Sequence, residues 1–216
     1  MTIGASTRPA RPASGPPGSR RRRRTQPTTS TRIDILKSAA AAFRKLGYHG
    51  ATVEQFAAAL HMKKGNLYYY FRNKEAILFA CHQYSLDRLI ETLEEIDRSA
   101  EPPHEKLRLL IHAFVHTILD ELHGTALGLN LEALSPAHLT TVIARRDLFD
   151  HGMRQIIAEG VRTGAFGPCD PKLISFAILG AVNWIPRWFK AEGPASSHEI
   201  ADCFADYLIA GLRTER

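Results

Sequence analysis

The sequence predicts an all-α protein, with a small N-terminal domain of three helices that includes a helix-turn-helix, a larger helical domain after it, and about nine helices in total. Apolar residues recur every three to four positions along most of the chain, which is the period of a helix with one buried face. Capping residues precede several of these periodic segments. No segment reads convincingly as a strand. The 216 residues are enough for one or two small domains with a real core.

Residues 1–29 differ from the rest of the chain, because Pro, Ser, Gly and Arg dominate there and large apolar residues are almost absent. Such a segment cannot bury a core, so we expect a disordered basic arm. It holds seven arginines and no acidic residue, and five of the arginines are consecutive at residues 20–24. These arginines would suit a narrow minor groove if the next domain binds DNA. A solubilising tail without a specific role is the alternative.

The first helix is expected over residues 31–46, and Gly47 follows it at the position where glycine commonly ends a helix. Its inward-facing residues are Ile35, Leu36, Ala39, Ala40 and Phe43. The second helix begins after Thr52, which forms the capping-box pattern with Gln55. Its apolar face consists of Val53, Phe56, Ala57 and Leu60.

A turn at residues 61–63 leads into a helix of only about two turns, residues 64–70. A helix this short is not stable alone, so we expect Leu67 and Phe71 to pin it to the rest of the domain. The opposite face is polar and aromatic, and it consists of Lys63, Lys64, Gly65, Asn66, Tyr68 and Tyr69. We therefore interpret this helix as an element that presents its outer face to a partner.

DNA is the partner that this arrangement favours. The second helix of a helix-turn-helix enters the major groove, where base edges offer hydrogen-bond donors, acceptors and the thymine methyl group. Lysine, asparagine and tyrosine side chains suit those edges. An ordinary helical hairpin with a solvated face is the alternative. The three consecutive tyrosines at residues 68–70 argue against it, because they cannot all be buried on one helix face.

The motifs GYHGATV at residues 47–53, KGNLYYYF at 64–71 and NKEAIL at 73–78 resemble the DNA-binding domain of the TetR family of transcriptional regulators. The resemblance runs from about residue 32 to residue 78 without a gap. It implies base contacts from Lys64, Gly65 and Asn66 together with Tyr69, and phosphate contacts from Thr52, Tyr68, Tyr70 and Lys74. Lys63 stands where the family usually has a serine or threonine cap, which leaves the cap unassigned and adds a positive charge near the DNA backbone.

Charge is distributed unevenly along the chain. The formal net charge is +6, of which residues 1–29 contribute +7 and residues 30–75 contribute +5, so residues 76–216 carry −6. This asymmetry is typical of one end that binds nucleic acid and another end with a different role. We therefore expect a DNA-binding domain at residues 30–78 and a ligand-binding and dimerisation domain at residues 79–216.

Six further helices are expected, at about residues 73–99, 104–122, 125–134, 136–163, 171–190 and 196–213. The first of them begins after the cap Asn73 and is long enough to leave the DNA-binding domain and enter the second one. Asp170 and Ser196 precede the last two helices as caps, Ser196 in a capping box with Glu199. Pro186 should kink or shorten the helix in which it lies.

The last two expected helices carry more apolar residues than their own neighbours can cover. Residues 173–184 are apolar nearly all round, and residues 200–212 carry a broad apolar stripe. A two-fold partner would cover them in a four-helix interface, and TetR-like proteins dimerise in this way. We therefore expect a homodimer through these two helices, with a purely intramolecular core as the alternative.

The C-terminal half is similar, through motifs such as RRDLF at residues 145–149 and NWIPRWF at 183–189, to TetR-family regulators of lipid and steroid catabolism, which typically sense acyl-CoA thioesters. An acyl or steroid tail needs an apolar tunnel between helices. The candidate ligand-binding residues are Phe114, Ile118, Leu131, Phe149 and Met153 for the tail, Arg145, Arg146 and Arg187 for phosphates, and Trp184 and Trp188 for a ring. Solvated arginines and tryptophans in a dimer interface are the alternative. The function expected is a ligand-responsive repressor, and a regulator of the same fold that senses drugs or other small molecules stays open.

Other functions have weaker support. The chain has no GxGxxG, Walker or GxSxG motif, so we expect neither an enzyme nor a cofactor; a helical enzyme acting on CoA esters is the alternative. A nucleoid-type protein that coats DNA through its arginine arm is a third interpretation. His112 and His116 have the i, i+4 spacing of a metal-binding pair, with Glu121 and His123 nearby. The sequence indicates no third ligand, so we expect no metal.

Cys81, Cys169 and Cys203 are isolated, which predicts no disulfide framework, no cysteine-based zinc site and a reducing cytoplasm. No apolar run reaches the roughly 18 residues of a membrane span, and the N-terminal arginines are not followed by the apolar core of a secretion signal.

Overall fold

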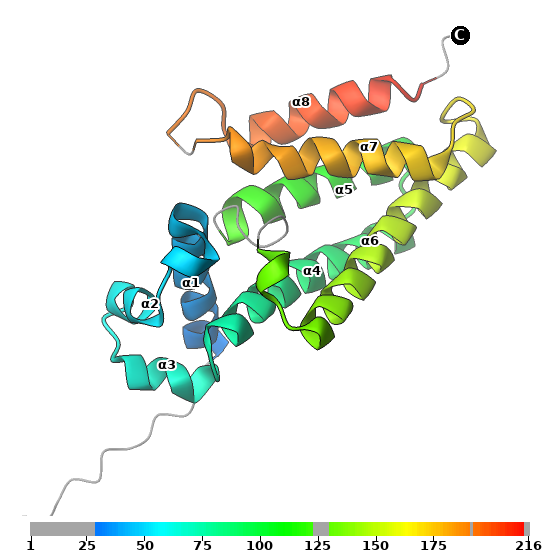
Figure 1. Ribbon diagram of the computed structural model, residues 1–216. Helices are drawn as coiled ribbons and strands as arrows, with labels where there is room; N and C mark the ends of the chain where they lie inside the picture. Colours follow the sequence, from blue (N-terminus) through cyan, green and yellow to red (C-terminus); the bar gives the residue numbers. More distant parts are fainter. Residues whose placement is uncertain (1–28, 123–129, 191, 214–216) are drawn as a thin grey trace, which may run out of the picture.

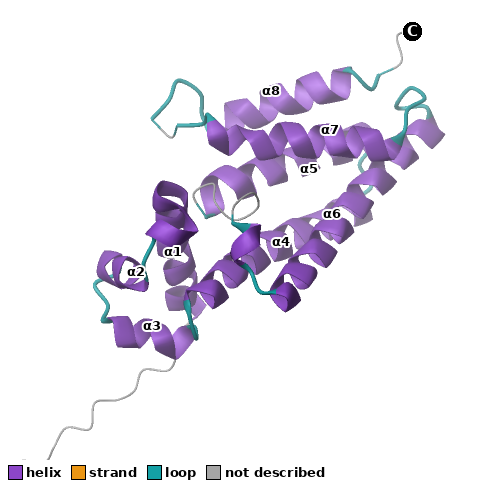
Figure 2. Cartoon of the chain, in the orientation of Figure 1, coloured by secondary structure: helices purple, strands orange, loops and turns teal. Residues whose placement is uncertain are grey.

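The computed structural model describes residues 29–122, 130–190 and 192–213. This part of the chain contains eight α-helices, three short turns of π- or 3-10-helix and no strand (Figure 1, Figure 2). The all-α prediction is therefore confirmed. The expected basic arm lies outside the described residues, apart from Thr29 at its end. None of the helices in the described ranges combines the length and the apolar composition needed to cross a membrane.

Three helices form the N-terminal domain, namely α1 (Thr29–Gly50), α2 (Val53–Ala59) and α3 (Lys64–Tyr70). Their common core contains Phe43, Phe56 and Leu67, and the two phenyl rings lie edge to face with their centroids 5.3 Å apart. Gly47 interrupts α1 with a φ of 69°, a left-handed conformation that residues with a Cβ rarely adopt. The regular part of α1 thus ends at the predicted glycine, and one further turn follows.

Helix α4 (Lys74–Arg98) begins in the N-terminal domain and continues through the second domain (Figure 1). Ile77 and Leu78 in its first turns are buried against the N-terminal domain, while Leu89 and Leu93 are buried further along. The predicted cap is present, since Oδ1 of Asn73 accepts a hydrogen bond from the backbone N–H of Ala76 at 2.7 Å. One continuous helix therefore belongs to both domains.

The second domain is completed by α5 (Pro103–His116), α6 (Pro136–Thr163), α7 (Pro171–Trp184) and α8 (Ser197–Ala210). Helix α5 continues into a short π-helical turn, Thr117–Glu121. Helix α5 packs along α8, and α6 packs against both α4 and α7 (Figure 1). The predicted caps Asp170 and Ser196 both accept backbone hydrogen bonds, and the capping box of Ser196 with Glu199 is complete.

Two predicted helices differ from the structure. Helix α7 ends at Trp184 instead of reaching residue 190, because Pro186 has no N–H to continue the helix, and a 3-10 turn, Ile185–Arg187, follows. Of the helix expected over residues 125–134, the part up to residue 129 lies outside the described residues. The remainder is only a 3-10 turn, Leu131–Ala133, because Asn130 is left-handed (φ 59°) and the cap of α6 follows directly. The described residues therefore form eight α-helices where about nine were expected.

Candidate DNA interface and effector cavity

Helix α3 is held by two buried apolar residues and presents its other side to solvent. Leu67 is fully buried and Phe71, directly after the helix, is only 5% exposed, so the predicted pinning is confirmed. Tyr68 and Tyr69 are 46% and 49% exposed. The residues at the leading end, Lys63, Lys64, Gly65 and Asn66, are exposed, and Tyr70 is half-buried. Helix α3 lies at the end of the molecule remote from α7 and α8 (Figure 1).

The leading end of α3 is basic and carries no side-chain cap. Lys63 occupies the cap position with extended backbone and makes no capping hydrogen bond, as its side-chain chemistry predicts. Lys64 forms an ion pair with Glu54 of α2, which lowers the pKa of Glu54 and raises that of Lys64. Both side chains are exposed, and exposed ion pairs contribute little to stability. Lys64 is therefore held near the outer face of α3 by a contact that a DNA group can replace.

Thr52 and Lys74 position the connection between α1 and α2. The capping box at Thr52 is present, with Gln55 N–H donating to Oγ1 of Thr52 and Thr52 N–H donating to Oε1 of Gln55. The ammonium group of Lys74 donates to the backbone oxygens of Tyr48 at 2.7 Å and Ala51 at 3.0 Å. It also lies 4.3 Å from the centre of the Tyr48 ring. Lys74 thus fixes the start of α4 to the chain that carries Thr52, and its predicted phosphate contact stays a prediction.

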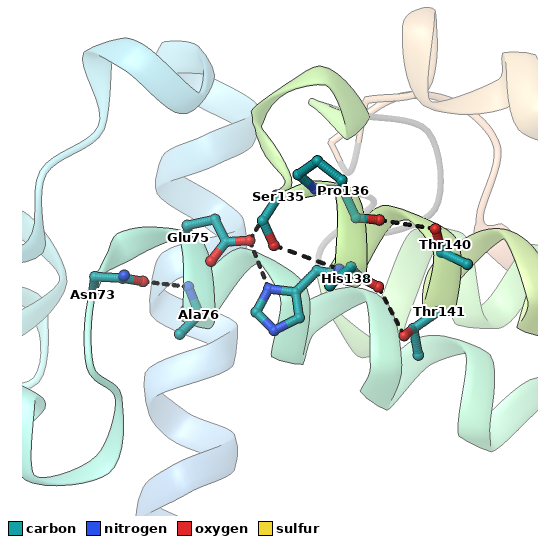
Figure 3. A network of polar contacts seen from close by, with 9 residues as sticks. Asn73, Glu75, Ala76, Ser135, Pro136, His138, Thr140 and Thr141 are labelled. Atoms are coloured by element: carbon teal, nitrogen blue, oxygen red, sulfur yellow. Dashed lines mark hydrogen bonds and ion pairs between the residues drawn. The ribbon is translucent and has the colours of Figure 1, made fainter.

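A polar network joins the first turn of α4 to the first turn of α6 (Figure 3). Oε1 of Glu75 accepts a hydrogen bond from the backbone N–H of Ser135 at 2.9 Å and lies 2.6 Å from Nδ1 of His138. The imidazole of His138 also stacks on Phe79, with centroids 3.8 Å apart and an angle of 10° between the rings. This network links the N-terminal domain to the second domain. No sequence pattern indicates it, because Glu75 and His138 are 63 positions apart.

Two opposing effects act on the Glu75 carboxyl group. Burial disfavours its ionised form, but the hydrogen bonds from Ser135 and His138 and the electrostatic effect of His138 outweigh burial, so the pKa of Glu75 lies below its ordinary value. Glu75 is therefore ionised at neutral pH and stabilises the contact between the helices. A second, longer contact between the domains runs from the backbone N–H of Tyr48 to Oδ1 of Asn130 at 3.4 Å.

A cavity of about 190 Å³ lies between α4, α5, α6 and α7. Its lining residues are Leu86, Leu89, Phe114, Arg146, Phe149, Leu179 and Asn183. The rings of Phe114 and Phe149 are 5.3 Å apart, and both side chains are buried. Burial lowers the pKa of Arg146, but an arginine remains charged at neutral pH. The cavity is therefore apolar with one cationic and one amide side chain in its wall.

The structure brings three of the predicted ligand-binding residues, Phe114, Arg146 and Phe149, to this cavity. The other candidates are placed differently. Ile118 and Met153 are buried in the core, and Leu131 packs at its edge. Arg145 forms an ion pair with Asp87 at the surface. At the end of α7, Trp184 and Trp188 are exposed, and the guanidinium of Arg187 lies 5.6 Å from the Trp184 ring.

Four lining residues were not among the candidates chosen from the sequence. Leu86 and Leu89 lie three positions apart on α4 and share a face of it. Leu179 and Asn183, four positions apart on α7, do the same. Helical spacing identifies such pairs as neighbours. It does not tell a residue that lines a cavity from a residue in an ordinary core contact, because that difference depends on how neighbouring helices pack.

Two family models match the chain. The model described as "Bacterial regulatory proteins, tetR family" matches residues 35–81, and the model described as "Tetracyclin repressor-like, C-terminal domain" matches residues 100–212. Together they cover the predicted DNA contacts of residues 52–74 and the part of the cavity lined by α5, α6 and α7. The chain belongs to the TetR family. It is therefore a DNA-binding transcriptional regulator and not an enzyme.

Other members of the TetR family are similar over most of their length. The transcriptional repressor KstR2 of Mycolicibacterium smegmatis is 27% identical over 187 residues, which are 85% of this chain and 91% of KstR2. The crystal structure of PfmR from Thermus thermophilus has a TM-score of 0.75 and 32% identity, and the match covers 83% of this chain and 99% of that one. The crystal structure of AibR in complex with isovaleryl coenzyme A and operator DNA has a TM-score of 0.72 and 28% identity. This match covers 82% of this chain and 98% of that one.

We predict that Tyr69→Ala weakens binding to the TetR-type operator while leaving non-specific DNA binding in place. Tyr69 is exposed on the outer face of α3, and a base contact contributes roughly 1–3 kcal/mol per half-site, so the loss expected for two half-sites is at least about thirtyfold. Tyr68→Ala is the matched variant. Because Tyr68 is expected to contact a phosphate, its replacement should weaken binding to operator DNA and to non-specific DNA alike. Operator affinity equal to wild type in folded Tyr69→Ala protein would contradict the base contact.

We predict that Glu75→Gln lowers the free energy of unfolding by about 1 kcal/mol at pH 7. Because the folded pKa of Glu75 is lowered, its stabilisation is fully present above the ordinary pKa of a glutamate, about 4.3, and is lost as the pH falls through the lower folded pKa. Urea unfolding of both proteins across this pH range measures the difference. Glu95→Gln, at an exposed site on the same helix, serves as the control. A difference that does not depend on pH would refute the role given to the carboxylate.

Proposed function

We propose that this TetR-family protein is a homodimeric repressor that binds a palindromic operator and is released by an acyl-CoA thioester with a short acyl group. The observation that carries the effector class is the cavity between α4, α5, α6 and α7. Its wall combines five apolar side chains with Arg146 and Asn183. Such a wall suits an apolar group that is attached to a polar or anionic one.

The size of the cavity favours a short acyl group. Sites that enclose drug-sized molecules have volumes of roughly 300–1,000 Å³, whereas this cavity has about 190 Å³. It has room for a short acyl chain but not for a nucleotide. Asn183 lines the cavity and is also exposed, so the cavity opens beside it and the rest of the CoA would extend through this opening.

The chain near this opening supplies groups that suit CoA. Trp184 follows Asn183 directly, and Arg187 lies over the Trp184 ring. An exposed ring and a guanidinium match the adenine and the phosphates of CoA. Trp188, also exposed, packs beside Phe204 with the ring centroids 6.3 Å apart. Under this proposal Arg146 holds the polar end of the acyl group, and Trp184 and Arg187 lie nearer the nucleotide.

Relatives support the effector class and the direction of regulation. AibR, 28% identical, is known in complex with isovaleryl coenzyme A and operator DNA, and isovaleryl is a short branched acyl group. KstR2, 27% identical, is a repressor. We infer that this protein acts in the same way on its own operator. An operator of this kind is bacterial chromosomal or plasmid DNA, so the protein would act in the cytoplasm.

The dimer is supported by an exposed apolar stripe on α7. Leu173, Phe176 and Gly180 follow one another at helical spacing, and all three are exposed in the single chain. On α8, Tyr207 is exposed as well. A contiguous apolar surface of this kind marks a protein–protein interface. We infer that two copies pack α7 and α8 against each other and set the separation of their α3 helices.

We predict that Arg146→Met weakens thioester-induced operator release about ten- to a hundredfold in effector concentration. A charge-assisted hydrogen bond contributes about 1.5–3 kcal/mol, which corresponds to that range. Arg162→Met, at an exposed site in the last turn of α6, is the control and should respond as wild type. The measurement is operator binding during titration with isovaleryl-CoA, a long-chain acyl-CoA, CoA alone and free isovalerate. Release by the free acid and not by the thioester would refute the effector class.

We predict that Phe176→Glu gives a monomer with weaker operator binding, because a buried charge at the two-fold interface is costly and a monomer engages one half-site only. Leu148→Glu places the same charge at an equally exposed apolar residue on α6, and this variant should remain dimeric. Light scattering coupled to size-exclusion chromatography measures both. A Phe176→Glu dimer as tight as wild type would place the interface elsewhere.

A further inference from the structure

Three histidines from two helices meet beside the junction of α5 and α8. His112 and His116 lie one turn apart on α5, and His198 lies in the first turn of α8. One ring nitrogen of each lies within 4.8 Å of the corresponding atoms of the other two. His198 is far from His116 in the sequence. The i, i+4 pair of His112 and His116 therefore gains a third histidine only when the chain folds. The side chain of Glu121 and the whole of His123, also noted in the sequence, lie outside the described part of the chain.

Two carboxylates border the three imidazoles. Asp202, one turn after His198 on α8, has one oxygen 3.2 Å from Nε2 of His112 and the other 3.6 Å from Nε2 of His198. Asp120 lies 2.7 Å from Nδ1 of His116 and accepts a hydrogen bond from the hydroxyl of Ser197 at 2.9 Å. Asp202 thus reaches two of the imidazoles, and Asp120 orients the third.

The donor set defines the chemical class of ligand. Neutral imidazoles with one carboxylate suit zinc and its borderline neighbours cobalt and nickel, whereas magnesium and calcium prefer all-oxygen sites. A histidine that binds a metal through one nitrogen usually gives its other nitrogen to a carboxylate. His116 has this arrangement, since Asp120 occupies Nδ1 and leaves Nε2 for the metal.

We propose that His112, His116 and His198, with Asp202 as the fourth ligand, form a binding site for a divalent transition metal of the zinc class. The site joins the end of α5 to the start of α8. It is separate from the cavity, although Phe114 of the cavity lies on α5 between the two histidines. The proposal does not depend on the identity of the effector.

The side chains need only small movements to bind the metal. A zinc–nitrogen bond of about 2.0–2.1 Å places two nitrogens of a tetrahedral site about 3.4 Å apart. In the structure the three ring nitrogens lie within 4.8 Å of one another. The His198 side chain is 69% exposed and lies in the first turn of a helix, so its ring has room to rotate towards the other two. A cluster of solvated histidines neutralised by Asp202 and Asp120 is the alternative.

Zinc binding to the full chain without a histidine tag tests the site. Metal-free protein is titrated with Zn²⁺ against a chromophoric chelator, and thermal unfolding is followed with and without Zn²⁺. We expect one zinc ion per chain and a higher melting temperature with zinc. His198→Gln should weaken binding at least about tenfold and lose the thermal shift. His151→Gln, an exposed histidine on α6, should behave as wild type.

Cobalt distinguishes the ligands. Co²⁺ in the proposed site should give the intense visible absorption of a tetrahedral ion without a thiolate-to-cobalt band. Such a band that disappears in Cys203→Ser would assign the metal to the exposed Cys203 instead and overturn the proposal. Wild-type protein that binds no zinc, or that binds it no better than His198→Gln, would overturn it as well. Because His198 is exposed, its replacement should preserve the fold, which the circular dichroism of the metal-free variant verifies.

Discussion

The structure depends on one constraint, which is that a single helix, α4, packs against both ends of one continuous hydrophobic core, one end in each domain. Its first turns bury Ile77, Leu78 and Cys81 against the DNA-binding helices, where burial raises the pKa of the Cys81 thiol to about 12. Further along, Leu86 and Leu89 line the cavity. No loop separates the two domains at this point, so the orientation of α3, the recognition helix of the helix-turn-helix, is coupled to the packing of the cavity wall. A change at one end of this core that tilts α4 is therefore transmitted to the other end.

Polar contacts hold the start of α4 to both domains. Lys74 binds two backbone oxygens of the DNA-binding domain, and the next residue, Glu75, binds the first turn of α6. Adjacent residues on α4 thus hold opposite domains. The same helix α6 supplies Arg146 and Phe149 to the cavity. A displacement of the cavity wall can therefore reach α3 through α4 and α6, which are joined by the contact of Glu75 with His138.

The sequence was sufficient where the determining interactions are local. The caps at Thr52, Asn73, Asp170 and Ser196 and the early end of α7 before Pro186 follow from groups a few positions apart. The pinning of α3 and its exposed tyrosines follow from helical period. The sequence was insufficient where partners lie far apart. The bond between Glu75 and His138, and the approach of His198 to His112 and His116, arise only when helices pack. The lining of the cavity also depends on how helices pack, which explains why Leu86 and Leu89 were not among the candidates. Arg146 was a candidate because its charge suits a phosphate, and not because its position in the fold could be predicted.

In the proposed mechanism, a small cavity can control DNA binding because of the length of α4. With 25 residues, α4 is about 37 Å long. A tilt of about 5° displaces one end of such a helix relative to the other by about 3 Å, and two-fold symmetry can double this change between the two recognition helices. Hydrogen bonds to base edges weaken steeply beyond about 3.2 Å, and half-sites lie roughly 34–36 Å apart or at a multiple of that spacing. An effector that moves Phe149 or Arg146 by only a fraction of its own size would therefore be sufficient to break the match with the operator. A large rearrangement of the second domain is not required, and the fixed contacts at Lys74 and Glu75 would keep the tilt from being absorbed at the junction of the domains.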